Sequence, residues 1–285
     1  MQYEQNTLRR LQIAELGILE AIDRVCRENG IMYFIDSGTV LGARRHGGFI
    51  PWDDDIDLGM PRDDFERFLE VAPEALGERF CVTCSRTNPH QAALFGKVML
   101  AGTRFVTDET EEAGFKQGVF VDIFPYDAVC SEPDAAKRQR KRCMMWQSLS
   151  YLYHSKHIVV PHQGVLGAVE KFACRIAHYM VRAVLSPERI NCGFDEAAMT
   201  ARDDRKSDML MVSSYAATEP FPKSMLLPPG TIRFEGIEFF APADVEGYLR
   251  AQYGETWSQL PPEDQRRNHA PKELYLGEWS SGYLG

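Results

Sequence analysis

The stretch Gly47-Gly-Phe-Ile-Pro-Trp-Asp-Asp-Asp-Ile-Asp-Leu-Gly-Met60 carries four aspartates, at positions 53, 54, 55 and 57, among apolar neighbours. If the chain is extended from residue 56 to residue 60, Asp55 and Asp57 point to the same face, because strand side chains alternate. Asp53 joins them if the extended conformation begins earlier. Like charges this close repel, so one carboxylate takes up a proton unless a cation sits between them. Hard oxygen ligands suit Mg²⁺ or Mn²⁺, and the stretch therefore predicts a divalent-metal site at the end of a strand.

Two other interpretations of the acidic run need to be considered. A run of aspartates is usually a solvated loop, but here Phe49, Trp52 and Leu58 favour burial. Counted from Asp53, a calcium-binding EF-hand loop needs glycine at its sixth position and glutamate at its twelfth. Leu58 and Asp64 stand at those positions, which excludes that motif.

A second acidic position lies far downstream, in Gly118-Val-Phe-Val-Asp-Ile-Phe-Pro125. This near-continuous apolar run is typical of a strand that is buried on both faces. Because an unpaired buried carboxylate is costly, Asp122 needs a cation or a strong donor. Either it forms a structural salt bridge, or it completes a three-carboxylate site with Asp55 and Asp57. Lys97, in an apolar run of strand length, either extends outward to solvent or pairs with an anion.

Just upstream of the aspartates, the turn Asp36-Ser-Gly-Thr39 leads from a short apolar run into a helix. Ser and Thr are good helix N-caps, and the free N–H groups of a helix N-terminus are a natural seat for phosphate. Most such turns only cap a helix, so this one gains weight from its place beside the acidic run. Arg44 follows; it either neutralises phosphate oxygens or lies on a solvated helix end.

Composition narrows the class of protein. The 285 residues carry a formal net charge of −9, which argues against nucleic acid as a partner. The polar start of the chain lacks the apolar core of a secretory signal, and the most apolar long stretch, residues 158–185, carries four charges and is no simple membrane span. Seven irregularly spaced cysteines fit reduced thiols better than a disulfide framework, so a cytoplasmic protein is expected. Cys81 and Cys84 have zinc-like spacing but no second pair.

Periodicity predicts the remaining elements. An amphipathic helix is expected over residues 8–26, a short helix over 243–253, and long helices from 131 to about 185. Strands are expected over 31–35, 80–85, 92–100 and 103–107, a hairpin turns at Glu235-Gly236, and the end of the chain is expected to be loop-like. The basic run Lys137-Arg-Gln-Arg-Lys-Arg142 is either a solvated helix face or a contact with an anionic polymer or with the inner face of a membrane.

Several of these segments together resemble the LicD family of phosphocholine transferases, whose wider group includes fukutin and fukutin-related protein. The segments are Phe34-Ile-Asp-Ser-Gly-Thr-Val-Leu-Gly42, Arg45-His-Gly-Gly-Phe-Ile-Pro-Trp-Asp-Asp-Asp-Ile-Asp57, Gly118-Val-Phe-Val-Asp-Ile-Phe-Pro-Tyr-Asp127 and Tyr253-Gly-Glu-Thr-Trp257. The resemblance covers most of the chain except about residues 131–204.

The resemblance implies an α+β fold, with a nucleotidyltransferase-like mixed sheet flanked by helices and a helical insertion. One domain would span residues 1–285, with a catalytic core over about 1–130 and 205–260 and a helical region over about 131–204. Carried over residue by residue, Asp55 and Asp57 would bind Mg²⁺ or Mn²⁺, with Asp122 as the third carboxylate and Asp53 as a further candidate ligand. Ser37, Gly38 and Thr39 would form the phosphate turn, although the order Ser-Gly departs from the Gly-Ser turn of that superfamily.

The implied reaction moves phosphocholine, or a similar group, from a CDP-linked donor such as CDP-choline to a hydroxyl of a cell-surface glycan or its lipid-linked precursor, as in teichoic acid or lipopolysaccharide. CMP would leave. Asp122 would ligate a metal or accept the hydroxyl proton, Lys97 and Arg44 would contact phosphate, and Trp52 would either face choline or pack in the core. Two alternatives stay open: a nucleotidyltransferase that transfers a nucleotide from a nucleoside triphosphate to a hydroxyl, and a non-catalytic acidic protein that binds a metal or a basic partner.

Overall fold

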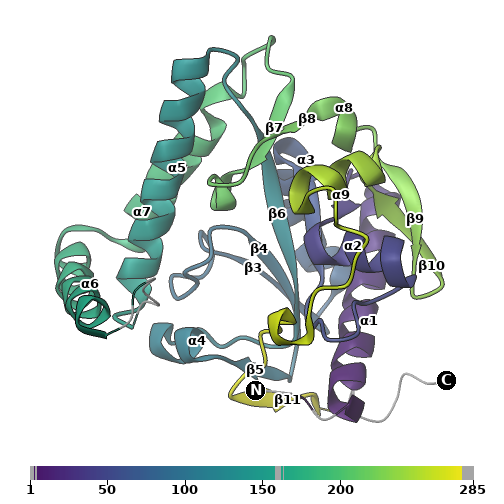
Figure 1. Ribbon diagram of the computed structural model, residues 1–285, viewed down its shortest axis with the longest axis horizontal. Helices are drawn as coiled ribbons and strands as arrows, with labels where there is room; N and C mark the ends of the chain where they lie inside the picture. Colours follow the sequence, from purple (N-terminus) through teal and green to yellow (C-terminus); the bar gives the residue numbers. More distant parts are fainter. Residues whose placement is uncertain (1–2, 4, 158–161, 163, 278–285) are drawn as a thin grey trace.

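The computed structural model describes residue 3 and residues 5–157, 162 and 164–277 (Figure 1). Its central sheet has the strand order β1 (Phe34–Ile35), β2 (Asp57–Pro61), β6 (Phe120–Ala128), β4 (Gly96–Leu100), β3 (Phe80–Cys84), while β7 (Met209–Val212) pairs with the end of β6 and β8 (Phe221–Pro222) pairs with β7. β2 and β6 are parallel, and the other pairs of this sheet are antiparallel. The predicted α+β architecture with a mixed sheet is confirmed.

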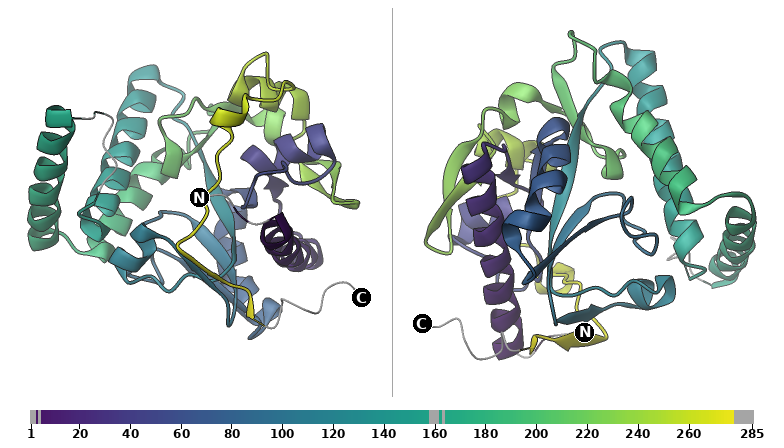
Figure 2. Two further views of the ribbon diagram at one scale, coloured as in Figure 1. Left: turned by 60° about the horizontal axis from the view of Figure 1, so that its bottom comes forward. Right: turned by 180° about the vertical axis from the view of Figure 1, so that it is seen from behind.

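Helices surround this sheet on three sides (Figures 1 and 2). α1 (Gln5–Asn29) and α3 (Arg62–Leu76) cover one face. α2 (Ser37–His46) and α9 (Val245–Tyr253) lie near the edge of the sheet that β1 and β2 form. α5 (Pro133–His154), α6 (Gly164–Val184) and α7 (Pro187–Ala198) form a separate helical layer. The shorter elements are α4 (Asp108–Ala113), α8 (Lys223–Leu226), the 3₁₀ turns Met199–Ala201, Ser213–Tyr215 and Glu263–Gln265, and the two-stranded pairs β9 (Gly230–Phe234) with β10 (Ile237–Ala241) and β5 (Arg104–Val106) with β11 (Glu273–Tyr275).

The core forms where the periodic apolar faces meet. α1 buries Leu11, Ile18 and Ile22 completely, as the predicted amphipathic helix requires. All but the last residue of β6 is buried, in agreement with its near-continuous apolar sequence. α3 begins at the proline that ends β2, and Phe68 of α3 is fully buried in the same core. Two helices packed on one face therefore leave the other face of the sheet for a site.

Most of the predicted elements are confirmed, with shifts of a few residues at their ends. The hairpin turns at Glu235 and Gly236, whose φ angles of 53° and 83° match the left-handed pair that such a turn requires. The strand expected over 92–100 begins only at Gly96. The reason is that the side-chain amide of Gln91 donates to the carbonyls of Ala93 and Phe95 and so replaces strand pairing there.

The prediction of a loop-like end is wrong for residues 273–275, which form β11 and pair with β5. That partner lies more than 160 residues earlier in the chain, so no local pattern announces the pairing. The apolar stretch 158–185 is described only in part, because residues 158–161 and 163 lie outside the described residues. Within the described part of the chain, no helix has both the length and the apolar character needed to cross a membrane.

Candidate active site

A cavity of about 460 Å³ lies on the face of the sheet that α1 and α3 leave open. The direction of the strands shows this: a Cβ built on Gly96 would meet Phe65 of α3, so the next side chain, Lys97, points to the opposite face. Asp55, Asp57 and Asp122 line the cavity together with Lys97. The three carboxylates that were expected to converge therefore border one space.

Strand register explains this convergence. Asp57 on β2 pairs with Asp122 on β6, and Asp122 pairs with Lys97 on β4, so three adjacent strands present these side chains in one row. Asp55 lies two residues before Asp57 and also reaches the cavity. Lys97 Nζ lies 2.5 Å from Asp122 Oδ1, and both side chains are buried. The ammonium group balances Asp122, and His269 lies within ion-pair distance of Asp55, whereas Asp57 has no cationic partner among the described residues.

The electrostatics of the row reflect this excess of negative charge. Burial raises the pKa of Asp57 well above its ordinary value, and the charges of Asp55 and Asp122 raise it further. The pKa values of Asp55 and Asp53 are also raised, first by burial and then by neighbouring aspartates, with His269 opposing the shift. Burial raises the pKa of Asp122 as well, against the opposing effect of Lys97. Without an added cation, the cluster holds protons that isolated carboxyl groups would release near neutral pH.

A buried glutamate on α1, Glu15, adds a further carboxyl group near the acidic run. The side chain of Glu15 is completely buried, and neither of its carboxylate oxygens has a hydrogen-bond partner among the described residues. Burial raises its pKa, and the charges of Asp55, Asp54 and Asp53 add to the effect. Glu15 is not among the residues that line the cavity, so its oxygens are not candidate ligands there. The fit to a divalent metal depends on the carboxylate oxygens of Asp55, Asp57 and Asp122, which line the cavity together.

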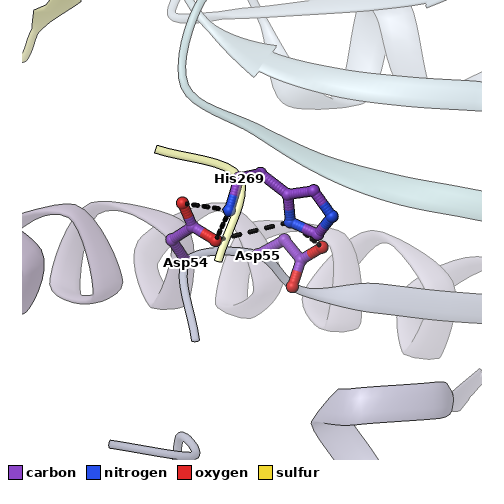
Figure 3. A group of neighbouring side chains, drawn as sticks. All are labelled: Asp54, Asp55 and His269. Atoms are coloured by element: carbon purple, nitrogen blue, oxygen red, sulfur yellow. Dashed lines mark hydrogen bonds and ion pairs between the residues drawn. The ribbon is translucent and has the colours of Figure 1, made fainter. Parts of the chain in front are cut away.

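Asp54, in contrast, has a structural role that the sequence did not reveal (Figure 3). It is fully buried and accepts hydrogen bonds from the hydroxyl of Tyr3 at 2.8 Å and from the backbone N–H of His269 at 2.8 Å. These bonds hold both ends of the chain against the acidic run. His269 Nδ1 thereby lies 3.3 Å from Asp55 Oδ2, and hydrogen bonding to Asp54 together with the charge of Asp55 raises the pKa of His269 to about 9.

His269 is the main site residue that sequence reasoning missed. One atom each of Asp54, Asp55 and His269 lie within 4.8 Å of one another, and they can ligate a metal once His269 gives up the proton that its raised pKa retains. A lone histidine in a polar segment, 214 residues after Asp55, carries no signal of its own (269 − 55 = 214). Only the pairing of the end of the chain with β5 and its bonds to Asp54 bring it to the cavity.

The turn that precedes α2 lies at the edge of the cavity. Its N-cap is Asp36, not Ser37 or Thr39, and so the expected Ser or Thr cap is wrong. Asp36 is buried and accepts hydrogen bonds from the hydroxyls of Tyr126 and Tyr248 as well as from the N–H of Ser37. Ser37 itself lines the cavity with a φ of 44°, a left-handed conformation that is strained for a residue with a side chain.

The other two predicted residues of this turn, Gly38 and Thr39, contact the acidic run outside the cavity. Thr39 is buried, and its hydroxyl oxygen accepts a hydrogen bond from the backbone N–H of Asp57 at 2.9 Å. A Cβ on Gly38 would lie 3.0 Å from Asp53 Oδ2, so glycine permits the close approach of the turn and the acidic run. Gly38 and Thr39 are not among the residues that line the cavity; they position those that do.

The structure does not bring Arg44 and Trp52 into the cavity, contrary to the predicted substrate contacts. Arg44, half-exposed, forms an ion pair of 2.6 Å with Glu246 of α9. The ring of Trp52 packs against the core, with the guanidinium group of Arg266 4.6 Å from its centre. Trp52 thus has the packing role that the sequence left open, and Arg44 joins α2 to α9.

Aromatic side chains form the wall of the cavity that faces the helical layer. Phe95, Phe124, Tyr151 and Tyr215 all line it. The ring centres of Phe95 and Phe124 are 4.5 Å apart, and the ring of Tyr215 lies 5.6 Å from that of Phe124. The cavity therefore joins a negatively charged floor to a wall of π-electron faces, a combination that suits an organic cation attached to a phosphate–metal complex.

The strand order, the paired aspartates and the third carboxylate on the neighbouring strand agree with the arrangement that the resemblance implies. Residues 30–166 match the family model described as LicD/FKTN/FKRP, nucleotidyltransferase domain. Over these residues the chain is similar to the LicD family of phosphotransferases.

Two kinds of relatives agree with this assignment. The lipopolysaccharide cholinephosphotransferase LicD of Haemophilus influenzae is 26% identical over 282 residues, which covers 95% of this chain and 98% of the relative. The ribitol 5-phosphate transferase FKRP of human and of mouse is 45% identical over 49 residues, 17% of this chain and 8% of the relative. The first similarity extends over the whole chain, whereas the second is confined to a short segment.

Proposed function

We propose that this protein transfers phosphocholine, or a similar phospho-substituent, from a CDP-linked donor to a hydroxyl of a cell-surface glycan or its lipid-linked precursor, with release of CMP. The observation that supports it most is the row of Asp57, Asp122 and Lys97 on three adjacent strands at the floor of the cavity. The similarity to the Haemophilus influenzae enzyme along nearly its whole length supports the transferred group and the kind of acceptor.

In this proposal Asp55 and Asp57 hold Mg²⁺ or Mn²⁺, with Asp53, Asp122 and His269 as further candidates. When bound, the divalent ion neutralises the charge of the diphosphate and stabilises the departing phosphate oxygen of CMP. The raised pKa values of Asp55 and Asp57, which both line the cavity, support a cation here. Thr39 fixes the backbone of Asp57, and Asp54 keeps His269 beside Asp55, so the candidate ligands are preorganised.

Asp122 and Lys97 have different roles in this reaction: Asp122 accepts a proton, and Lys97 contacts a phosphate oxygen. The acceptor hydroxyl oxygen forms a bond to the phosphorus that carries choline, and the bond from that phosphorus to the bridging oxygen breaks. The electron pair leaves with CMP, and the hydroxyl proton goes to Asp122. Burial raises the pKa of Asp122, which makes it a stronger base than an exposed carboxylate, while the ammonium group of Lys97 at 2.5 Å is placed to contact a phosphate oxygen next to it.

The aromatic wall supplies the recognition of choline that was first expected of Trp52. A quaternary ammonium group gains about 1–2 kcal/mol from the faces of aromatic rings. Tyr215, Phe95 and Phe124 line the cavity and pack against one another, so they form one aromatic surface beside it. Replacing Tyr215 by Ala is expected to raise the KM for CDP-choline by roughly tenfold and to leave the KM for CDP-glycerol within about twofold.

We place the reaction in the cytoplasm. The support is the chemistry of the thiols: all seven cysteines lie among the described residues and are unpaired. Cys81 is exposed and Cys84 is buried, three residues apart on β3, so they face opposite sides and do not share a ligand.

Product analysis tests the proposed reaction. The protein is incubated with Mg²⁺, an acceptor glycan and either CDP-choline or CTP, and the nucleotide products are separated. Release of CMP from CDP-choline, with choline and phosphate on the glycan, supports the proposal. Release of pyrophosphate from CTP instead would establish a nucleotidyltransferase. No turnover of either donor, with Asp57→Asn indistinguishable from wild type, would favour a non-catalytic metal-binding protein.

A further inference from the structure

The outer face of α6 is apolar and exposed along its whole length. Half of the large hydrophobic side chains that are exposed in the described part of the chain lie on this one helix. Phe172 and Met180 are each 64% exposed and Val184 is 78% exposed; the set is completed by Leu166, Val169, Ile176 and Tyr179. Scattered exposed apolar residues are normal on a protein surface, but seven on one face of one helix form an interaction surface.

The spacing of these residues shows that they form a single stripe. Positions 166, 169, 172, 176, 180 and 184 follow intervals of three and four, so they line one side of a helix. The opposite side packs against α5: Val181 and His178 are buried, and His178 Nδ1 donates to the carbonyl of Leu152 at 2.7 Å. Beyond α5, α6 forms the outer edge of the molecule in each view (Figures 1 and 2).

The charged residues that lie beside the apolar stripe are all basic. Lys171, Arg175 and Arg182 are exposed and lie on the same flank, because positions four and seven residues apart are neighbours on a helix. The one acidic residue of the helix, Glu170, lies toward the packed side and pairs with His162. A helix with net positive charge is thus displayed by a protein whose formal net charge is −9, so the charge of this face differs from that of the whole.

We propose that α6 docks on a membrane surface that contains anionic lipids, lying parallel to it with the apolar stripe in the interface. An apolar face flanked by Lys and Arg is the pattern of interfacial helices, in which apolar burial and attraction to anionic headgroups act together. This surface differs from the basic run Lys137–Arg142 of α5, where the sequence suggested a membrane contact. The proposal concerns lipid binding alone and stands whether or not the transfer reaction is the one proposed above.

The position of α6 gives the docking a consequence for the active site. Leu152, to which α6 is hydrogen-bonded, directly follows Tyr151, and Tyr151 lines the cavity. Only the last turns of α5 therefore separate the docked helix from the aromatic wall. A membrane held at α6 brings lipid-linked molecules to that side of the protein.

Vesicle co-sedimentation of the full chain in EDTA tests the docking. Vesicles are made of phosphatidylcholine alone or with one third phosphatidylglycerol. We expect binding to the anionic vesicles, at least about tenfold weaker binding to the neutral ones, and a loss on the order of tenfold or more for Phe172→Gln with Ile176→Gln. Lys171→Gln with Arg175→Gln should weaken anionic-vesicle binding by about tenfold and reduce its dependence on salt.

Matched controls locate the surface. Ile237→Gln with Leu260→Gln removes exposed apolar groups elsewhere, and Lys137→Gln with Lys141→Gln removes two charges from α5. Both should bind as wild type does, and all variants should melt within a few degrees of it. Equal binding to both kinds of vesicle, full binding by the Phe172/Ile176 variant, or an equal loss in the Lys137/Lys141 variant overturns the proposal. A further result also overturns it: the wild-type protein does not bind vesicles but associates with itself, and the Phe172/Ile176 variant does not self-associate. The apolar stripe is then an interface between copies of the chain.

Discussion

Two aspartates of the same strand, β6, are buried five residues apart and have opposite surroundings (127 − 122 = 5). Asp127 receives two bonds of 2.7 Å from the guanidinium group of Arg62 and one of 2.6 Å from the hydroxyl of Ser213. Asp122 receives one bond, from Lys97, and lies beside Asp57 of the neighbouring strand, with Asp55 on the lining of the same cavity. Burial alone therefore does not mark a functional carboxylate. What marks it is negative charge that the protein leaves unbalanced beside an open space.

The largest effect on activity should come from replacing Asp57, the neighbour of Asp122 in the acidic row. Asp57→Asn keeps the shape of the side chain and removes its charge, so phosphocholine transfer should fall about a thousandfold, a loss of several kcal/mol of metal-assisted stabilisation. Arg44→Ala is the control: its exposed ion pair is worth at most about 1 kcal/mol, and activity should stay within about threefold. Rates with CDP-choline decide, and an Asp57→Asn enzyme within tenfold of wild type removes Asp57 from the site.

The Arg62–Asp127 pair should contribute more to the free energy of unfolding than the Lys97–Asp122 pair does. Arg62→Met leaves Asp127 buried without its partner, which should lower the free energy of unfolding by about 3 kcal/mol or more. Lys97→Met should lower it less, because Asp122 borders a cavity and can take up a proton. Urea unfolding of the two variants gives the order directly. If the Lys97 variant proves the less stable one, the Lys97–Asp122 pair is a structural salt bridge of the same kind as Arg62–Asp127.

Metal should act on the unbalanced carboxylates alone. At one hundred times its dissociation constant, Mg²⁺ should stabilise the folded protein by about 2.7 kcal/mol, because the unfolded chain does not bring the aspartates together. Asp63→Asn, at an exposed position on α3, should keep this increase in melting temperature, whereas Asp57→Asn should lose most of it. A melting temperature that millimolar Mg²⁺ or Mn²⁺ leaves unchanged, with a CDP-linked donor present, contradicts metal binding at this site.

The smallest expected effect is on the pH dependence of stability without metal. The pKa values of Asp53, Asp55 and Asp57 are raised in the folded protein, chiefly by burial, so the folded state binds protons more tightly than the unfolded chain. Stability should therefore fall as the pH rises above about 4, the ordinary carboxyl value, and through the raised pKa values. His269, with a pKa raised to about 9, acts in the same direction.

Thermal unfolding in EDTA at pH 5 and pH 8 measures this slope. We expect a loss on the order of 1–2 kcal/mol at the higher pH, which Mg²⁺ should largely abolish because it replaces the protons as the balancing charge. In Asp57→Asn the loss should be smaller. A metal-free protein that is more stable at pH 8 than at pH 5 would show that the carboxylates are already compensated.

The sequence alone determined the fold class, the strand that carries Asp57, the buried strand that carries Asp122 and the apolar face of α1. Each depends on a periodic pattern or a run of a few residues, and such patterns act through local backbone geometry. The distinctive motifs also sufficed to recognise the family. The predicted roles of Asp55, Asp57 and Asp122 remain predictions, now with a geometry that permits direct tests.

Only the tertiary structure decided which side chains share the cavity. Lys97 stands beside Asp122 because β4 pairs with β6 in one register, and His269 stands beside Asp55 because the end of the chain is held by Asp54 and β5. The same long-range packing turned Arg44 toward Glu246, covered Trp52 with Arg266, and chose Tyr215 and its neighbours for the aromatic wall. Contacts between residues far apart in the chain depend on how whole elements pack, and local sequence patterns carry no record of that packing.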